Sequence, residues 1–443
     1  MEAEEMKALF AKRYSYENVP VAKGEMSPKE RFEAIMDFRK PDRIIDCEFG
    51  YWDNTLTRWQ REGMPKEVTS NDKADVYFGF DIWSRGLGVN SGLLEWFPEE
   101  IIEKTDRYTI KYDGRRIKCQ VFTDGTDTIP HYLDFPIKDR QTYLPFKERF
   151  RPEVSRRIPA NIAEVAQKVR NRNYVLQLYG GSTAGWMRDL MGFEGFSIGI
   201  CMQPELIDEF VADLGDQFEA IAREVTKYLQ VDLIAWWEDI AFKTGPIVPP
   251  DFFYNKCGPA YKRAMDIYRA HGTKHAYVDC DGDNRLLVPT WLDHGVDIIF
   301  PLEVNAGVHP ENLRGRYPKI RMMGGFDKVV LLRGTDAIKK ELLRLKPLVD
   351  EGGFVPHVDH RVQADVSYRD YLYYLEAKRD IYGLPGKVLD VTRGRPKGAV
   401  VRRKAEARKG KAGPARKSRT TARPGRTRAR GRKAQQGRRK GRT

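Results

Sequence analysis

The chain has 443 residues, 41% of them hydrophobic, which is enough for one large barrel or two ordinary domains with a sizeable core. No window approaches the roughly eighteen uninterrupted apolar residues of a membrane span, and the acidic start MEAEEMKALF lacks the apolar region of a secretory signal. The five cysteines are scattered and odd in number, so we expect a cytoplasmic protein without a disulfide framework.

The net charge of +14 is concentrated at one end of the chain. Residues 397–443 hold 20 Lys and Arg against the single acid Glu406, which leaves the rest of the chain at −5. This segment is too polar to form a core, so we predict a disordered tail over residues 384–443. Such a tail either binds nucleic acid or an anionic surface through phosphate contacts, or is a solvated extension without a part in the chemistry.

The first hundred residues predict helices and two strands. Residues 1–26 are charged and predict an N-terminal helical extension. Ser27-Pro28-Lys29-Glu30 is a capping box with proline at the first helical position, so a helix begins here and ends before Pro41. The apolar runs 44–49 and 76–83 predict the first two strands.

Residues 100–140 differ in kind from the rest of the chain. Alternating residues at 108–112 and 117–122 flank Asp113-Gly114, which predicts an antiparallel hairpin inserted after the second strand. The Pro- and Asp-rich segment 123–139 follows as a loop and a candidate lid.

From residue 161 onward, apolar runs alternate with segments of helical spacing. The six runs predict strands over 174–179, 231–237, 275–280, 296–301, 320–325 and 353–358. With the first two, they give eight strands with intervening helices, and we predict a (β/α)8 TIM barrel over residues 27–383. A doubly wound sheet is the alternative, but no G-x-G-x-x-G or Walker motif follows any strand.

Polar side chains gather at the ends of the predicted strands, where a parallel barrel places its catalytic groups. Asp279, Asp281 and Asp283 follow one strand and Glu303 follows the next. Asp279 and Asp281 are two residues apart and so share a face of the strand, with Cys280 opposite them. The other candidates near strand ends are Glu48, Trp52, Asp81, Trp237, Glu238, Asp239, Lys243, Asp327, His357 and His360.

The chain resembles the uroporphyrinogen decarboxylase superfamily, which also contains cobalamin- and coenzyme M-dependent methyltransferases. The resemblance covers residues 27–383 and rests on SPKERFEAIMDFRKPDRI, FGFDIW, VDCDGD with FPLEV, GGFDK and GGFVPHVDHRVQADVSYRDYLYYLE. It implies the barrel fold. Asp81, in its Asp-Ile context, matches the catalytic aspartate of the decarboxylases.

Departures from the family pattern bear on the reaction. The decarboxylases carry an arginine-bearing segment that binds substrate carboxylates, and here the segment 47–52 reads CEFGYW, without arginine. The methyltransferases hold zinc with His-x-Cys and a later Cys, and these positions fall on Asp279, Asp281 and His360. The thiolate-rich zinc site is therefore absent, although Asp, Asp and His are competent ligands for a harder or borderline divalent ion, zinc included.

Each candidate also has a structural interpretation. Asp281 with His360 either acts in metal or acid–base chemistry or ties two loops together, and Glu303 either binds substrate or metal or pairs with Lys328. Glu238, Asp239 and Lys243 form either an acid–base cluster or a salt-bridge network. His357 is either a proton shuttle or a packed strand histidine.

Three hypotheses of function follow. The first is metal-assisted methyl transfer from a small methylated substrate to a corrinoid carried by a partner protein, with Asp81, Glu238, Glu303 and His357 as catalytic candidates. In it, Asp279, Asp281 and His360 hold the metal, while Glu48, Trp52, Trp237, Lys243 and Asp327 bind substrate. The second is decarboxylation of a uroporphyrinogen-like tetrapyrrole, and the third is polyanion binding through the basic tail.

Overall fold

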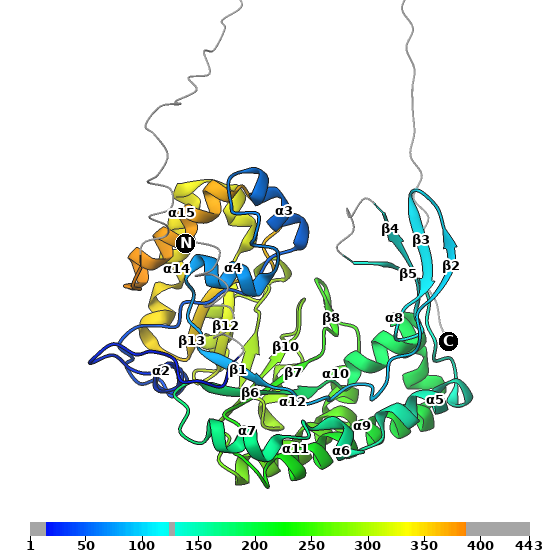
Figure 1. Ribbon diagram of the computed structural model, residues 1–443. Coiled ribbons are helices and arrows are strands. Elements are labelled where there is room, and N and C mark those ends of the chain that lie inside the picture. Colours follow the sequence, from blue (N-terminus) through cyan, green and yellow to red (C-terminus); the bar gives the residue numbers. More distant parts are fainter. Residues whose placement is uncertain (1–14, 124–128, 387–443) are drawn as a thin grey trace, which may run out of the picture. The chain divides into compact units, whose positions relative to one another are not determined.

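A seven-stranded parallel sheet forms the centre of the computed structural model, which describes residues 15–123 and 129–386 (Figure 1). Each strand pairs with the next one in the order β1-β6-β7-β10-β11-β12-β13. The strands are β1 (Ser84–Leu87), β6 (Val175–Gly181), β7 (Leu233–Trp237), β10 (His275–Asp279), β11 (Ile298–Phe300), β12 (Arg321–Phe326) and β13 (Phe354–Val358). Because all pairs are parallel, the carboxyl ends of the strands lie on one side of the sheet.

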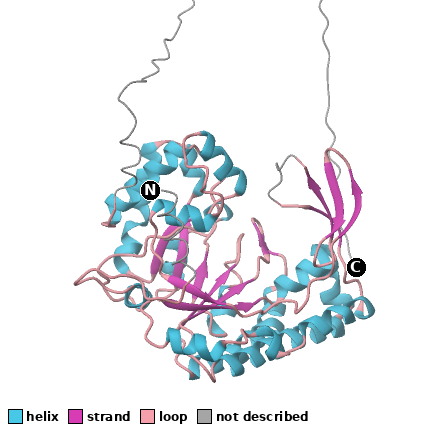
Figure 2. Cartoon of the chain, in the orientation of Figure 1, coloured by secondary structure: helices cyan, strands magenta, loops and turns pink. Residues whose placement is uncertain are grey.

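Helices connect successive strands and pack on the sheet (Figure 2). The N-terminal ones are α2 (Pro28–Met36), α3 (Asp53–Arg61), α4 (Asn71–Phe78), α5 (Arg140–Phe150), α6 (Val154–Arg157), α7 (Ile162–Val169) and α8 (Ala184–Met202). They are followed by α9 (Pro204–Val225), α10 (Pro250–Phe252), α11 (Gly258–Ala270), α12 (Val288–Asp293), α13 (Pro310–Arg316), α14 (Thr335–Glu351) and α15 (Tyr368–Tyr382). The capping box that begins α2 is confirmed, because Ser27 Oγ accepts from the Glu30 amide and the Glu30 carboxylate accepts from the Ser27 amide.

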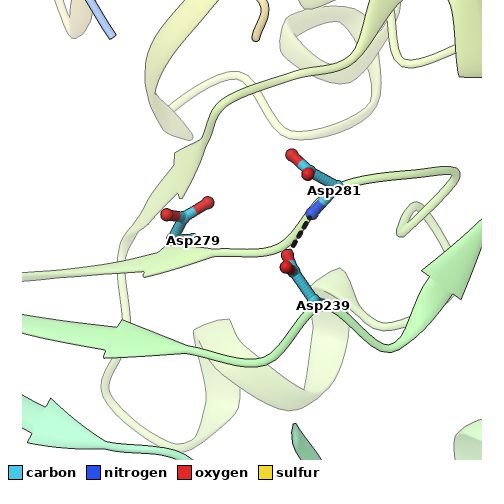
Figure 3. Close-up of side chains that lie close together, drawn as sticks. All are labelled: Asp239, Asp279 and Asp281. Atoms are coloured by element: carbon cyan, nitrogen blue, oxygen red, sulfur yellow. Dashed lines mark hydrogen bonds between the residues drawn. The ribbon is translucent and has the colours of Figure 1, made fainter. Parts of the chain in front are cut away.

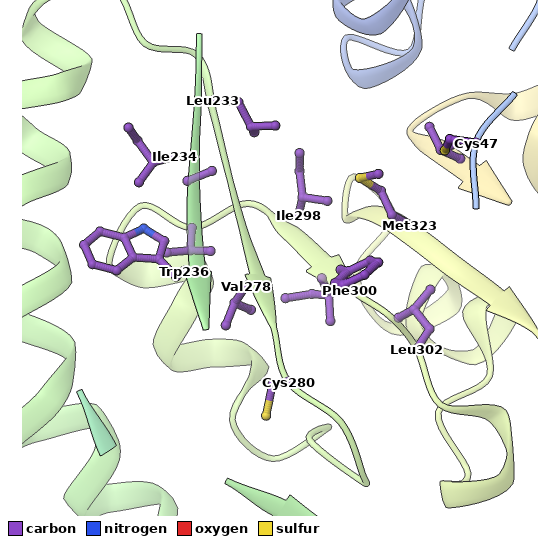
Figure 4. Close-up of a cluster of buried hydrophobic side chains, with 14 of the residues drawn as sticks. Cys47, Leu233, Ile234, Trp236, Val278, Cys280, Ile298, Phe300, Leu302 and Met323 are labelled. Atoms are coloured by element: carbon purple, nitrogen blue, oxygen red, sulfur yellow. The ribbon is translucent and has the colours of Figure 1, made fainter. Parts of the chain in front are cut away.

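The central strands are buried on both faces, as parallel strands between helices must be. Trp236, Val278 and Ile298 are at most 1% exposed and belong to one continuous core (Figure 4). Burying side chains of this size contributes about 1.5–3 kcal/mol each. This continuous burial explains why the strands predicted at 231–237, 275–280, 296–301, 320–325 and 353–358 were recognisable from apolar runs alone.

The first two predicted strands are wrong. Ser70 caps α4 and Gly79, with φ of 72°, ends it, so the aromatic run 76–83 is divided between a helix and an extended segment that precedes β1. Residues 44–49 are extended but make no strand; the nearby Tyr51 forms only an isolated bridge with Val362. A complete eight-stranded barrel is therefore not formed by the described residues, which form a partial barrel of seven parallel strands.

The predicted hairpin lies within a four-stranded antiparallel sheet of order β2-β3-β4-β5. Its strands are β2 (Glu100–Lys104), β3 (Tyr108–Tyr112), β4 (Lys118–Phe122) and β5 (His131–Asp134). The segment predicted as a loop thus contains a strand, β5, on the edge of this sheet. Arg115, in the turn between β3 and β4, bonds Asp189 of α8 at 2.7 Å and so ties the sheet to the barrel.

The two terminal segments fall largely outside the described residues. Of the helical extension predicted over residues 1–26, residues 1–14 are not described and residues 15–26 contain no helix. The predicted tail lies outside them from residue 387 onward. None of the described helices is both long and apolar enough to cross a membrane.

A buried network of charges joins α15 to the extended segment 44–49. Lys378 is 0% exposed and its Nζ lies 2.8 Å from the Glu48 carboxylate and 3.3 Å from that of Asp46. Arg379 donates to Asp46 at 2.8 Å. The segment that makes no regular strand is thus held in place by ion pairs.

We expect Lys378→Met to destabilise the fold by about 3–5 kcal/mol, because the substitution leaves buried carboxylates without a counter-charge. Urea unfolding measures the change. Arg369→Met is the matched control on the same helix, since Arg369 is 89% exposed and its surface pair with Asp370 contributes little. Equal unfolding midpoints for the two variants would contradict a stabilising role of the buried network.

Candidate active site

Three aspartates meet at the carboxyl ends of β7 and β10. Donor oxygens of Asp239, Asp279 and Asp281 lie within 4.8 Å of one another (Figure 3). The strands place them there: Asp279 pairs with Trp237 in register, and Asp239 and Asp281 each stand two residues further along their segments. The Asp281 amide donates to Asp239 Oδ1 at 3.0 Å, which fixes the two loops against each other.

Confinement of these carboxylates changes their ionisation. Burial, then the charges of Asp239 and Asp281, raise the pKa of Asp279 well above its usual range. Burial and the charge of Asp281 also raise the pKa of Asp239 to about 6. The nearby guanidinium groups of Arg361 and Arg188 oppose these shifts only in part. The cluster therefore retains a proton close to neutral pH unless a cation compensates its charge.

His360 completes the group. Its Nε2 lies 2.9 Å from Asp281 Oδ2, and its ring stands edge-on to Phe49 with centroids 5.2 Å apart. The Trp52 ring lies 5.7 Å from the His360 ring, on the path from the extended segment into α3. The other oxygen of Asp281, Oδ1, is buried and has no hydrogen-bond partner among the described residues.

A second group of charges lies beside the first. Lys328 Nζ contacts Glu303 Oε1 at 2.9 Å, and the Gly282 amide donates to Glu303 Oε2 at 3.1 Å. Burial opposes ionisation of Glu303, but Lys328 outweighs it and lowers the pKa of this carboxyl. Asp359 accepts from the Val304 and Lys328 amides, and burial raises its pKa to about 7. Glu303 is thus paired with Lys328, which was the structural alternative for this residue.

Glu238 lies on the buried side of its loop, away from Asp239. Its carboxylate accepts from the Gly185 amide at 2.6 Å, from both the amide and hydroxyl of Thr183 at 2.7 Å, and from Ser182 and Tyr261. The side chain is 0% exposed, and burial raises its pKa to about 7. The structure therefore brings Asp239 into the acidic cluster, whereas Glu238 holds the loop between β6 and α8.

Two more of the predicted residues, Glu48 and His357, are buried in the core and bonded to neighbouring groups. The Glu48 side chain is 0% exposed and accepts from Lys378, Tyr374 and the Val358 amide, which leaves no oxygen for substrate. His357 is 1% exposed and its Nδ1 faces the Val358 carbonyl at 2.8 Å. Burial lowers the pKa of His357 to about 3, so it is a neutral, packed histidine and not a proton shuttle.

Asp81 and Asp327 are also engaged by partners. Asp81 precedes β1 and receives two hydrogen bonds from Arg43, at 2.6 and 2.7 Å. The sequence predicts Asp81 near the end of a strand over 76–83, and because that strand is not formed, Asp81 does not lie at a carboxyl end of the sheet. Asp327 caps the turn after β12 by accepting from the Val329 amide at 2.9 Å.

The remaining candidates differ in exposure. Trp237, at the end of β7, is half-buried beneath the Arg188 guanidinium, which lies 5.2 Å from its ring. Lys243 is exposed in the short hairpin of β8 (Ala241–Phe242) and β9 (Gly245–Pro246). Of the predicted site residues, the structure brings together Asp239, Asp279, Asp281, His360 and Trp52, with Glu303 beside them.

Comparison with known proteins identifies a shared fold. No family model and no curated protein matches the chain. Among solved structures, a methyltransferase from Methanosarcina mazei superimposes with a TM-score of 0.52, covering 80% of this chain and 99% of its own. The two are 14% identical in sequence, so the similarity concerns the fold.

We expect Asp239→Asn to stabilise the metal-free protein at neutral pH. Because burial raises the pKa of Asp239 from 3.8 to about 6, the folded protein binds more protons than the unfolded chain within this window. Stability is thus lost as the pH rises through it. Removing the charge should add on the order of 1–3 kcal/mol at pH 7.5 and nothing below about pH 4.

Urea unfolding from pH 4 to 8 in the presence of EDTA measures this effect. Asp283→Asn is a control of opposite sign, because a hydrogen bond from Arg285 lowers the pKa of Asp283. That variant should be less stable than the parent throughout this range, because the range lies above the lowered pKa of Asp283. A destabilised Asp239→Asn protein at pH 7.5 would show that the cluster is not strained by its own charge.

Proposed function

We propose that the protein is a methyltransferase-type enzyme that removes a methyl group from a small methylated substrate, such as an aryl methyl ether or a methylamine. A corrinoid on a partner protein accepts the methyl group. The observation that supports this most directly is the meeting of Asp239, Asp279, Asp281 and His360 at the carboxyl ends of the strands. The fold shared with a methyltransferase agrees with it but does not identify the reaction.

The same group of side chains fits a divalent metal. Three carboxylates and an imidazole suit a borderline or hard cation such as Zn²⁺ or Mn²⁺. The nearby thiol of Cys280 is buried and directed at the Asp281 carbonyl, so the donor set contains no thiolate. Asp281 Oδ1 has no hydrogen-bond partner among the described residues and could bind a cation. The raised pKa of Asp279 shows that negative charge at this position is unfavourable, and a cation would relieve it. Such an ion would polarise the heteroatom that bears the methyl group.

The protein's own groups supply the proton and the geometry. When a methyl group leaves, its heteroatom gains negative charge and needs a proton. Burial raises the pKa of the Asp279 carboxyl well above its usual range, so this group would carry that proton whenever it is not itself a ligand of the ion. His360 fixes the orientation of Asp281, and Lys328 with Glu303 keeps the neighbouring loop in position.

We expect Asp281→Asn and His360→Ala each to reduce binding of Mn²⁺ or Zn²⁺ by about 10- to 100-fold, because each loses a ligand or its orienting partner. Calorimetric titration of the purified protein measures this, and methyl transfer to free cob(I)alamin is followed in parallel. Asp266→Asn, in an exposed salt bridge on α11, is the control and should match the parent. Unchanged metal affinity and turnover in both variants would remove the two residues from the mechanism.

Decarboxylation of a porphyrinogen is the less favoured activity. Its catalytic counterpart, Asp81, is held by Arg43 at the start of β1, and a substrate with many carboxylates would meet the acidic cluster. Incubation with uroporphyrinogen should therefore yield no coproporphyrinogen by chromatography. Formation of that product at an enzymatic rate would overturn the methyltransferase proposal.

A further inference from the structure

Arg361 occupies a distinctive position beside the acidic cluster. It follows β13 by three residues, and its guanidinium carbon lies 5.2 Å from the centre of the Trp52 ring. The same indole ring packs against His360, whose Nε2 lies 2.9 Å from Asp281 Oδ2. The Trp52 ring thus lies near both the His360 ring and the Arg361 guanidinium.

Arg361 has no oxygen acceptor among the described residues, although it is half-buried. All other buried or half-buried arginines of the described part donate to a carboxylate or carbonyl oxygen. These are Arg31, Arg43, Arg58, Arg85, Arg115, Arg116, Arg149, Arg157, Arg172, Arg188, Arg269, Arg314, Arg321, Arg344 and Arg379.

The surroundings of Arg361 favour an anion from outside the chain. A guanidinium stacked on an aromatic ring keeps its edge N–H groups free and loses little conformational entropy when it binds. Those N–H groups match the two oxygens of a carboxylate. The charge of Arg361 also acts on Asp279, which shows that the guanidinium lies close to the group of acids.

We propose that Arg361, supported by Trp52, binds the carboxylate of a methylated carboxylic acid and thereby sets substrate specificity. The proposal rests on the proposed function for the identity of the methyl group, but not for the binding of the anion. The three aspartates repel a carboxylate, whereas the guanidinium attracts it. An acid of this kind therefore binds in one orientation, with its anionic end at Arg361 and the other end toward Asp279 and Asp281.

The other cations nearby do not fulfil this role. Arg188 is paired with Asp189 at 2.8 Å, and Lys328 is paired with Glu303 at 2.9 Å. Lys243 is exposed on a hairpin tip and lacks an aromatic support that would fix it. Of these cations, Arg361 is the one whose N–H groups have no oxygen acceptor among the described residues and whose guanidinium lies over an aromatic ring.

The test compares an acid with its neutral amide. Binding of 3-methoxybenzoate and of 3-methoxybenzamide to the full-length protein is measured by tryptophan fluorescence and calorimetry, with no corrinoid present. The parent should prefer the acid by about 10- to 100-fold, the value of one charged hydrogen-bonded pair. Arg361→Gln should abolish this preference and leave the affinity for the amide unchanged.

Two further variants keep the test decisive. Arg369→Gln, at an exposed position of α15, should retain the parent's preference. Arg361→Lys keeps the charge without the bidentate edge and should bind the acid several-fold more weakly than the parent, even if Arg361→Gln fails to fold. Equal affinity of the parent for acid and amide, or an undiminished preference in Arg361→Lys and Arg361→Gln, would overturn the proposal.

Competition with inorganic phosphate separates two kinds of anion. Phosphate should displace 3-methoxybenzoate only weakly; tight, Arg361-dependent binding of phosphate without binding of the acid would refute the assignment to carboxylates. Because these measurements involve no turnover, Arg361-dependent binding without methyl transfer to cob(I)alamin would overturn the proposed reaction alone. Methyl transfer from substrates without a carboxylate, unaffected by Arg361→Gln, would overturn the specificity proposal alone.

Discussion

The confinement of three like charges at the end of two neighbouring strands is the constraint on which the site depends. Asp239, Asp279 and Asp281 stand within 4.8 Å of one another because parallel pairing of β7 with β10 brings their carboxyl ends together. In water such charges would repel weakly, but the partial burial of all three carboxylates reduces the screening. The protein therefore holds a site that takes up either protons or a cation, and this property comes from the geometry of the sheet.

Neighbouring interactions maintain that geometry. Asp239 has a φ of 49°, an uncommon conformation for a residue with a side chain, and the hydrogen bonds to the adjacent Glu238 keep the chain there. The buried pairing of Lys378 with Glu48 fixes the segment that leads to Trp52. Glu48 and Glu238 thus support the site from the core, although the sequence pattern suggested that they face substrate.

The sequence was most informative where burial alone determines structure. The parallel strands from 174 to 358 are largely apolar, so their positions and the acids that follow them could be predicted. The run 76–83 was misassigned because Gly79 ends a helix within it, and aromatic composition does not distinguish a helix from a strand. Asp239 joins the acidic cluster and Glu238 turns into the core because Asp239 has a left-handed backbone conformation. The spacing of apolar residues in the sequence does not reveal such a conformation. The sequence also could not predict that the Arg361 guanidinium lacks an oxygen acceptor, since this depends on which acceptors other segments place nearby.

The site carries negative charge on one side and positive charge on the other, so a molecule with unlike ends would bind in one orientation. Its acidic side, around Asp281, excludes anions and attracts protons or cations, while its basic side, at Arg361, does the reverse. The Trp52 ring lies near both the His360 ring and the Arg361 guanidinium, and the charge of Arg361 acts on Asp279 although no ion pair joins the two. Arg361 has no oxygen acceptor among the described residues, and a bound carboxylate would supply one. On the proposal made above, this arrangement favours substrates that are charged at one end and carry the reacting group at the other.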